Sequence, residues 1–207
     1  MVGGAYATIQ AAIDASNDFD TIVVPPGTYP EVIDFLGKQV TVESQGGPDV
    51  TVIDGTGLGE SVVTMASGET PASILRGFTI TGGVGHLTGG GIRRGGGLRM
   101  ASGSGTVESC VFRGNAADQG GAICLQSSAG AIRSCRVGTP GSGNAATSLG
   151  GGIALLFAPT NGSEAHVVDT IVQNNVADVD AAGGLYIQGT AARIVGCEFL
   201  GNSTGGG

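Results

Sequence analysis

Hydrophobic and polar residues alternate in short bursts along this chain, and the bursts recur. Four triplets of small residues, each made of Gly and Ala, directly precede Leu98, Ile123, Ile153 and Leu185. These four aliphatic residues are separated by 25, 30 and 32 residues, and a second aliphatic residue follows each of them two positions later. Side chains two residues apart lie on one face of a strand. The pattern therefore predicts a short β-strand in every repeat.

A second burst forms three apolar columns when its five copies are aligned. The first column is Leu75, Val107, Ile132, Val167 and Ile194. The second is Phe78, Cys110, Cys135, Thr170 and Cys197, and the third is Ile80, Phe112, Val137, Val172 and Phe199. The second and third columns are two residues apart and share a strand face, whereas the first and second are three apart. The odd spacing predicts a bend between two strands.

These repeats predict the fold class. A helical solenoid would need apolar residues at helical spacing, which the bursts do not show. Gly accounts for 41 of 207 residues and serves tight turns, while 41% hydrophobic and 13% charged residues argue against disorder. We predict an all-β chain that forms a single-stranded, right-handed parallel β-helix, a solenoid whose stacked coils bury files of aliphatic side chains.

The two ends of the chain differ. Residues 6–16 form the one convincing amphipathic helix, with Thr8 as its N-cap, and we expect this short helix to cap the first coil. The predicted organisation is one domain, with the cap and first strand in residues 1–30 and stacked coils in residues 31–207. No cap is visible at the C-terminal end. Either the natural chain continues, which we favour, or another molecule covers the edge, as in a homo-oligomer stacked end to end at the C-terminal coil.

Charge and hydropathy exclude two classes of partner. The net charge is −8, and residues 1–75 contain ten acidic residues against one basic residue, Lys38. An acidic, lysine-poor surface argues against nucleic-acid binding. No stretch of about 18 apolar residues is present, so we predict no membrane span.

Two groups of proteins share motifs with the chain. Residues 7–16 (ATIQAAIDAS) and 20–31 (DTIVVPPGTYPE) resemble the opening of pectin-lyase-like right-handed parallel β-helix proteins. The GGAI tetrad at residues 120–123, with FRGN at 112–115 and FLGN at 199–202, is similar to the GGAI and FxxN repeats of polymorphic outer-membrane proteins. The resemblance implies an exported bacterial protein, secreted or at the cell surface, with an elongated surface. It implies no particular activity.

Catalytic proteins of the pectin-lyase-like group act on acidic polysaccharides, and their machinery is not evident here. The segment Gly85-His86-Leu87 departs from the Gly-His-Gly of polygalacturonase-like enzymes. No carboxylate cluster with a partner base stands out on one outward wall. We expect no catalytic role for the isolated His86 and His166. Whether the chain is an enzyme is left open, with a non-catalytic role favoured.

Six residues are the candidates for ligand binding. Arg93, Arg94 and Arg99 flank the glycine-rich residues 82–97, and they form either a basic groove for acidic sugars or solvated charges on a flexible loop. Asp178 and Asp180, with Asp118 one or two coils away, are weak Ca²⁺ candidates, although acids in a turn are usually solvated turn formers. We expect no other cofactor.

The remaining polar and sulfur-containing residues have structural interpretations. Cys110, Cys135 and Cys197 occupy an inward column and Cys124 should face outward, all as free thiols. Arg76, Glu108 and Arg133 share an outward column that predicts a ladder of salt bridges. Four asparagines recur at coil corners, where they cap backbone groups: Asn115, Asn144, Asn175 and Asn202.

The function favoured by the sequence is a non-catalytic extracellular or cell-surface β-helix segment. Its outer wall would bind a polysaccharide, a cell-surface glycan or another partner, or only extend the rod. One alternative is a lyase-like or hydrolase-like enzyme, or its inactive remnant, acting on acidic polysaccharide. The other is a self-associating fibrous element that stacks end to end.

Overall fold

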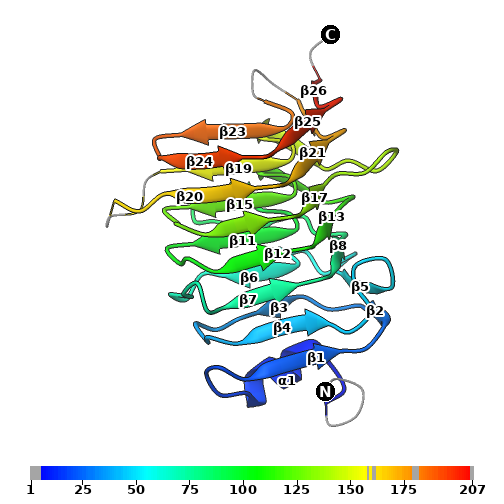
Figure 1. Ribbon diagram of the computed structural model, residues 1–207. Helices are drawn as coiled ribbons and strands as arrows, with labels where there is room; N and C mark the ends of the chain where they lie inside the picture. The colour runs from blue at the N-terminus through cyan, green and yellow to red at the C-terminus, as the bar shows by residue number, and fades with distance from the viewer. Residues whose placement is uncertain (1–5, 158, 160–161, 179–181, 206–207) are drawn as a thin grey trace.

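The chain forms a rod of stacked coils in a computed structural model that describes residues 6–157, 159, 162–178 and 182–205. In Figure 1 the front strands run from left to right, the chain turns back behind them, and each coil lies above the one before. This path is right-handed and single-stranded. The predicted parallel β-helix is therefore confirmed, and the strand pairs are all parallel except β9 with β10.

Each coil contributes strands to four sheets that run along the rod. Sheet 1 contains β1 (Thr21–Val24), β4 (Thr41–Ser44), β7 (Ile74–Arg76), β12 (Thr106–Glu108), β16 (Ala131–Arg133), β20 (Ala165–Val168) and β24 (Ala192–Val195). Sheet 2 contains β2 (Gly27–Tyr29), β5 (Thr51–Asp54), β8 (Thr79–Thr81), β13 (Val111–Phe112), β17 (Arg136–Val137), β21 (Ile171–Gln173) and β25 (Glu198–Leu200).

The other two sheets close each coil. Sheet 3 contains β9 (His86–Leu87), β10 (Arg93–Arg94), β14 (Ala116–Gln119), β18 (Ala145–Leu149), β22 (Val176–Ala177) and β26 (Ser203–Thr204). Sheet 4 contains β3 (Ile33–Asp34), β6 (Val63–Met65), β11 (Leu98–Ala101), β15 (Ile123–Gln126), β19 (Ile153–Leu156) and β23 (Leu185–Gln188).

The predicted apolar columns lie inside the tube in register. Val107 pairs with Leu75 on one side and with Ile132 on the other, and all three side chains are 0% exposed. Leu98 pairs with Ile123, which pairs with Ile153, and these residues too are fully buried. Aliphatic side chains repeated at about 4.8 Å, the strand separation of a sheet, thus form one continuous core.

In the five coils that contain the second burst, the predicted bend between sheets 1 and 2 falls on a single residue. Ser109, Ser134 and Asp169 have left-handed backbone angles, with φ of 53°, 50° and 49°, and Gly77 and Gly196 occupy the same corner in other coils. One left-handed residue turns the chain sharply, which explains the three-residue spacing between the first two columns.

The four corner asparagines form a buried ladder between sheets 2 and 3. Asn115 Nδ2 donates to Asn144 Oδ1 at 3.0 Å, Asn144 Nδ2 to Asn175 Oδ1 at 2.8 Å, and Asn175 Nδ2 to Asn202 Oδ1 at 2.9 Å. Each Nδ2 also donates to a backbone carbonyl of the preceding coil; for Asn144 this is Phe112 O. The asparagines thus satisfy buried backbone groups that the turn would leave unpaired.

The helix α1 (Ile9–Ala15) closes the N-terminal end, as the sequence predicted. Thr8 Oγ1 accepts from the backbone of Ala11, and Ile9 and Ile13 are fully buried on the first coil. The Glu31 carboxylate accepts from the first backbone N–H groups of the helix. The Lys38 ammonium donates to three carbonyls at the other end at 2.7–2.8 Å. No helix in the described part of the chain has the length and apolarity needed to cross a membrane.

Two details differ from the prediction. Cys124 does point away from the tube, but it is only 1% exposed because it packs with Ala154 and Leu156 in a small second cluster on the outside of sheet 4. Residues 82–97 are not one irregular loop: they contain β9 and β10, and β10 starts the parallel part of sheet 3.

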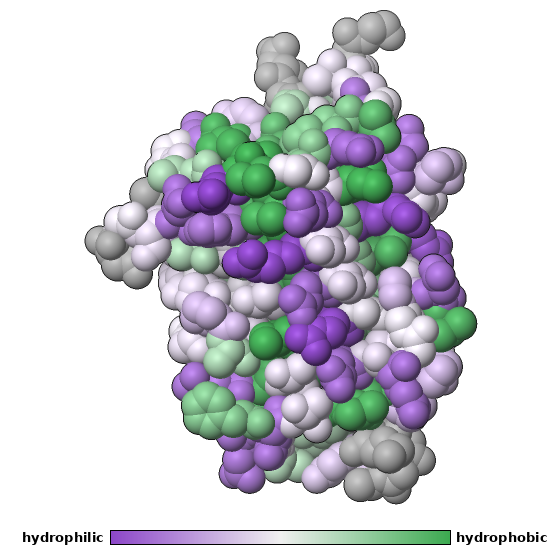
Figure 2. Space-filling model, viewed as in Figure 1, coloured by the Kyte–Doolittle hydropathy of each residue, from purple (hydrophilic) through white to green (hydrophobic). Residues whose placement is uncertain are grey.

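The last coil leaves part of the core exposed. Two residues of its inward columns, Ile187 and Phe199, are 44% and 45% exposed. Figure 2 shows many hydrophobic residues at this end of the rod.

Candidate functional site

The three arginines predicted to form a basic groove do not act together. Arg93 donates to the carbonyls of Gly59 and Gly85 at 2.9 and 2.7 Å. Arg94 donates to the side-chain oxygens of Gln119 and Gln126 at 2.7 and 3.0 Å. Both guanidinium groups therefore hold residues 82–97 against the solenoid. Arg99 lies on the outer face of β11 and pairs with Cys124; burial raises the pKa of that thiol, and the charges of both Arg94 and Arg99 oppose the shift.

The acidic candidates lie along sheet 3, the wall that also contains β10 with Arg93 and Arg94. Asp118 accepts from the backbone N–H of Arg93 at 2.7 Å and from the Thr147 hydroxyl at 2.6 Å, and these bonds lower the pKa of its carboxyl. Asp178 is exposed, and Asp180 lies outside the described residues. Within the described ranges no three His, Cys, Asp or Glu side chains come together as metal ligands. Calcium binding by Asp178 and Asp180 stays a prediction.

Arg99 belongs to an outward column that crosses three coils. Thr64 pairs with Asp34 on one side and with Arg99 on the other, so the acid and the base flank a threonine on the outer face of sheet 4. Two strand separations put their Cα atoms roughly 10 Å apart. No ion pair joins Asp34 and Arg99 among the described residues.

These residues line a pocket of about 440 Å³, which we call the Arg99 pocket. Its lining comprises Gln10, Val32, Ile33, Asp34, Glu60, Ser61, Thr64, Ala66, His86 and Arg99. Glu60 Oε2 lies 2.9 Å from His86 Nδ1, which fixes the orientation of the ring. The Ser61 hydroxyl accepts from the His86 backbone N–H at 3.0 Å and donates to the Arg94 carbonyl at 3.2 Å. The wall that carries His86 is thus held against the solenoid.

Helix α1 fixes the opposite wall. Gln10 Oε1 accepts from the Asp34 backbone N–H at 2.7 Å, and Gln10 Nε2 donates to the Asp34 carbonyl at 3.2 Å. The side-chain amide thereby pairs with the free edge of β3 as a neighbouring strand would. The capping helix therefore fixes one wall of the pocket and also covers the end of the core.

The pocket contains two electrostatically unusual groups. Burial raises the pKa of the Asp34 carboxyl, and the nearby Glu69 charge raises it further, while the Leu36 N–H and the Arg99 charge oppose the shift. Arg99 Nε is buried and, within the described part of the chain, has no hydrogen-bond partner. An unpaired buried polar group costs about 1–3 kcal/mol. The rest of the half-buried Arg99 side chain lines the pocket, where a ligand acceptor could bond to its guanidinium group.

Sequence reasoning found Arg99, missed Asp34 and Glu60, and treated His86 as isolated although it pairs with Glu60. The missing signal is the register of the first coils, which puts Ile33 over Val63 and Leu98 and therefore aligns Asp34, Thr64 and Arg99. Those coils carry no glycine triplet before β3 or β6, so the repeat that aligns the later coils does not extend to them.

Comparison with known proteins assigns neither a family nor a role to this chain. The sequence matches no protein-family model and no curated protein. Among solved structures, a mutant pectin methylesterase bound to a hexasaccharide is similar over 83% of this chain and 76% of its own, with 11% identity and a TM-score of 0.44. The pectin methylesterase from carrot is similar over 95% and 80%, with 14% identity and a TM-score of 0.43. We transfer no residue role from either. The similarity to the repeats of polymorphic outer-membrane proteins stays a prediction.

Proposed function

We propose that this chain is an extracellular or cell-surface β-helix segment that binds a glycan, with one sugar residue held in the Arg99 pocket. The observation that carries the proposal is the half-buried Arg99 side chain, which lines the pocket, forms no hydrogen bond among the described residues, and is separated from the Asp34 carboxyl by the small side chain of Thr64. A sugar hydroxyl both donates and accepts a hydrogen bond. It can therefore accept from Arg99 and donate to a carboxylate oxygen of Asp34.

The charge of the pocket indicates the kind of sugar. Asp34 and Glu60 provide two carboxyl groups against one guanidinium, and Glu69 adds a further negative charge close by. A uronate would meet repulsion from these acids, whereas a neutral sugar would meet acceptors and donors for its hydroxyl groups. This pocket therefore suits a neutral sugar, in contrast to the basic groove for acidic sugars expected of Arg93, Arg94 and Arg99 together.

Binding by arrayed glycans, followed by calorimetry with the best ligand, tests the proposal. We expect Arg99→Met and Asp34→Asn each to weaken binding about tenfold or more, since each removes a charge-assisted hydrogen bond. Arg193→Met is the matched control, because Arg193 is exposed on sheet 1, away from the pocket. A failure of all neutral glycans to bind, or equal affinity in Arg99→Met and Arg193→Met, would contradict the proposal.

Hydrolysis of the bound glycan is a second candidate, favoured by the two acidic groups of the same pocket. The raised pKa of Asp34 suits a proton donor, and the Glu60–His86 pair provides an oriented imidazole that can accept a proton from water. Release of reducing ends from the bound glycan would show this activity. It should be lost in Asp34→Asn and in His86→Phe, and an absence of new reducing ends with the wild-type protein would leave binding as the only function.

A further inference from the structure

A second concave surface lies on the outside of the corner between sheets 1 and 2, on walls that do not contribute to the Arg99 pocket. Two depressions of about 400 and 370 Å³ adjoin there and share Pro48, Asp49, Val111 and Arg136. We call them together the corner groove. The residues 45–50, between β4 and β5, overhang it, and Arg113, Thr139 and Ser142 line its far part.

Two arginines from neighbouring coils enter this groove. Val111 of β13 pairs with Arg136 of β17, so Arg136 points outward over the coil that precedes it. Arg113 follows Val111 by two residues and therefore shares its outward face, diagonal to Arg136. Both arginines line the same depression, although Arg113 is half-buried and Arg136 is exposed.

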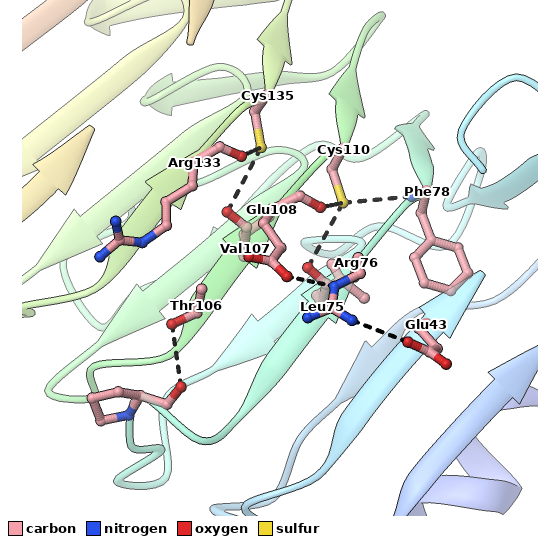
Figure 3. Close-up of polar contacts among 11 residues, drawn as sticks. Glu43, Leu75, Arg76, Phe78, Thr106, Val107, Glu108, Cys110, Arg133 and Cys135 are labelled. Carbon is pink, nitrogen blue, oxygen red and sulfur yellow. Dashed lines mark hydrogen bonds and ion pairs between the residues drawn. The ribbon is translucent and has the colours of Figure 1, made fainter. Parts of the chain in front are cut away.

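The guanidinium groups of Arg113 and Arg136 make no polar contact within the described part of the chain that would stabilise the fold. Among the described residues neither forms a hydrogen bond or an ion pair, and Asp49 and Asp169, the acids that line the groove, are beyond 4.0 Å of them. Arg76 shows the alternative: Figure 3 shows it paired with Glu43 and with Glu108, one column away. The predicted salt-bridge ladder is confirmed only for Arg76 and Glu108, because Arg133 forms no ion pair among the described residues. A chain of net charge −8 thus keeps two unpaired cations side by side.

The walls of the groove are held in place without a ligand. The Thr79 hydroxyl donates to the Pro48 carbonyl at 2.7 Å and fixes the overhanging loop. Thr139 and Ser142 exchange two backbone hydrogen bonds of 3.0 Å, which close a tight turn beside Arg113. The Ser142 side chain reaches the vicinity of Gly114, next to Arg113. The arginines are therefore carried on fixed elements, which lowers the entropy cost of binding.

We propose that the corner groove binds the terminal oxyanion of a sulfate ester or a phosphate monoester, held between Arg113 and Arg136. A carboxylate presents two oxygens, and one guanidinium already satisfies both in a bidentate pair. Two guanidinium groups on one depression suit an anion with three terminal oxygens, and the hydroxyl of Ser142 can donate to the third. Asp49 opposes the anion and limits its affinity.

Calorimetry with matched small probes tests this site on the whole chain. The probes are glucose 6-sulfate, glucose 6-phosphate, glucuronate and inorganic sulfate. We expect one or both esters to bind about tenfold or more tightly than glucuronate, because only they can engage both arginines. A preference between the two esters identifies the source of the oxyanion.

Variants separate this site from the Arg99 pocket. Arg113→Gln with Arg136→Gln should weaken ester binding about tenfold or more, and Asp49→Asn should strengthen it. Arg133→Gln, a neighbouring exposed arginine outside the groove, and Arg99→Met should leave the affinity within about twofold. Equal binding of glucuronate and the esters, retention of ester binding in a folded double variant, or binding of inorganic sulfate alone would overturn the proposal. None of these results depends on the glycan proposal.

Discussion

The asparagine ladder allows a quantitative prediction for Asn144→Ala. Asn144 donates to Phe112 O at 3.0 Å and to Asn175 Oδ1 at 2.8 Å. It accepts from the backbone N–H and the side-chain Nδ2 of Asn115 at 3.1 and 3.0 Å. All four hydrogen bonds are buried or nearly so, and all four are lost in the alanine variant.

The loss of stability in Asn144→Ala can be estimated from which partner groups keep another hydrogen bond. Phe112 O keeps its bond from Gly138, and Asn175 Oδ1 keeps its bond from the backbone of residue 144, whereas the Asn115 N–H has no other partner. Three hydrogen bonds at about 0.5–1.5 kcal/mol each and one orphaned buried donor at about 1–3 kcal/mol give a loss of about 2.5–7.5 kcal/mol. This is a large part of the stability of an ordinary domain.

Urea unfolding followed by circular dichroism measures this loss through the shift in midpoint, with the slope checked for a change in cooperativity. The control is Asn174→Gly, one residue before the ladder, where the side chain makes only a 3.4 Å contact and φ of 53° suits glycine. The control should change stability by less than about 0.5 kcal/mol. A loss in Asn144→Ala below about 1 kcal/mol, or one equal to that of the control, would refute the reasoning.

Five further predictions concern other parts of the chain. Lys38→Met should lower the stability by about 1–2 kcal/mol in thermal unfolding, because three carbonyls at the end of α1 lose a charged donor. Because the pKa of Asp34 is raised in the folded chain, stability falls as pH rises through its titration; Asp34→Asn should be more stable than wild type at neutral pH and equal to it in acid. Asp118, whose pKa is lowered, should show the opposite sign: Asp118→Asn is less stable at neutral pH, and the difference disappears as pH falls, so parallel curves for the two variants would contradict both assignments. A thiol reagent should label only Cys197 in the folded chain, since the other three thiols are buried, and rapid labelling of a second thiol would contradict this burial. If the exposed last coil mediates end-to-end association, sedimentation should show a concentration-dependent dimer that Phe199→Glu abolishes; a monomer at high concentration argues against it.

The architecture could be predicted because the repeat itself records the register. Val107, Ile132 and Val167 occupy one interior row, as their alignment in sequence indicated. The three-residue spacing to the next column likewise revealed the corner that Ser109 and Ser134 form with left-handed backbone angles. Strand pairing in a solenoid is periodic, so aligning the repeats of the sequence shows which residues pair between neighbouring coils.

The candidate site could be predicted only in part, because it depends on contacts that the repeat does not encode. Arg93 and Arg94 looked available in sequence, yet they bond to carbonyls and glutamines of other coils. Cys124 was correctly placed on the outer face, but alternation alone does not reveal that Leu156 and Ala154 cover it. The Glu60–His86 pair joins a loop residue to the first residue of β9, and no periodicity specifies the path of either segment.

The central claim is that the coils stack in register, since this alignment brings Asp34, Thr64 and Arg99 into one pocket and Arg113 and Arg136 into one groove. Backbone nuclear Overhauser effects in solution test it most directly, because neighbouring parallel strands lie about 4.8 Å apart. We predict cross-strand signals from Arg99 to both Thr64 and Cys124, and from Val107 to both Leu75 and Ile132. Signals displaced by one residue, or none between these strands, would contradict the account.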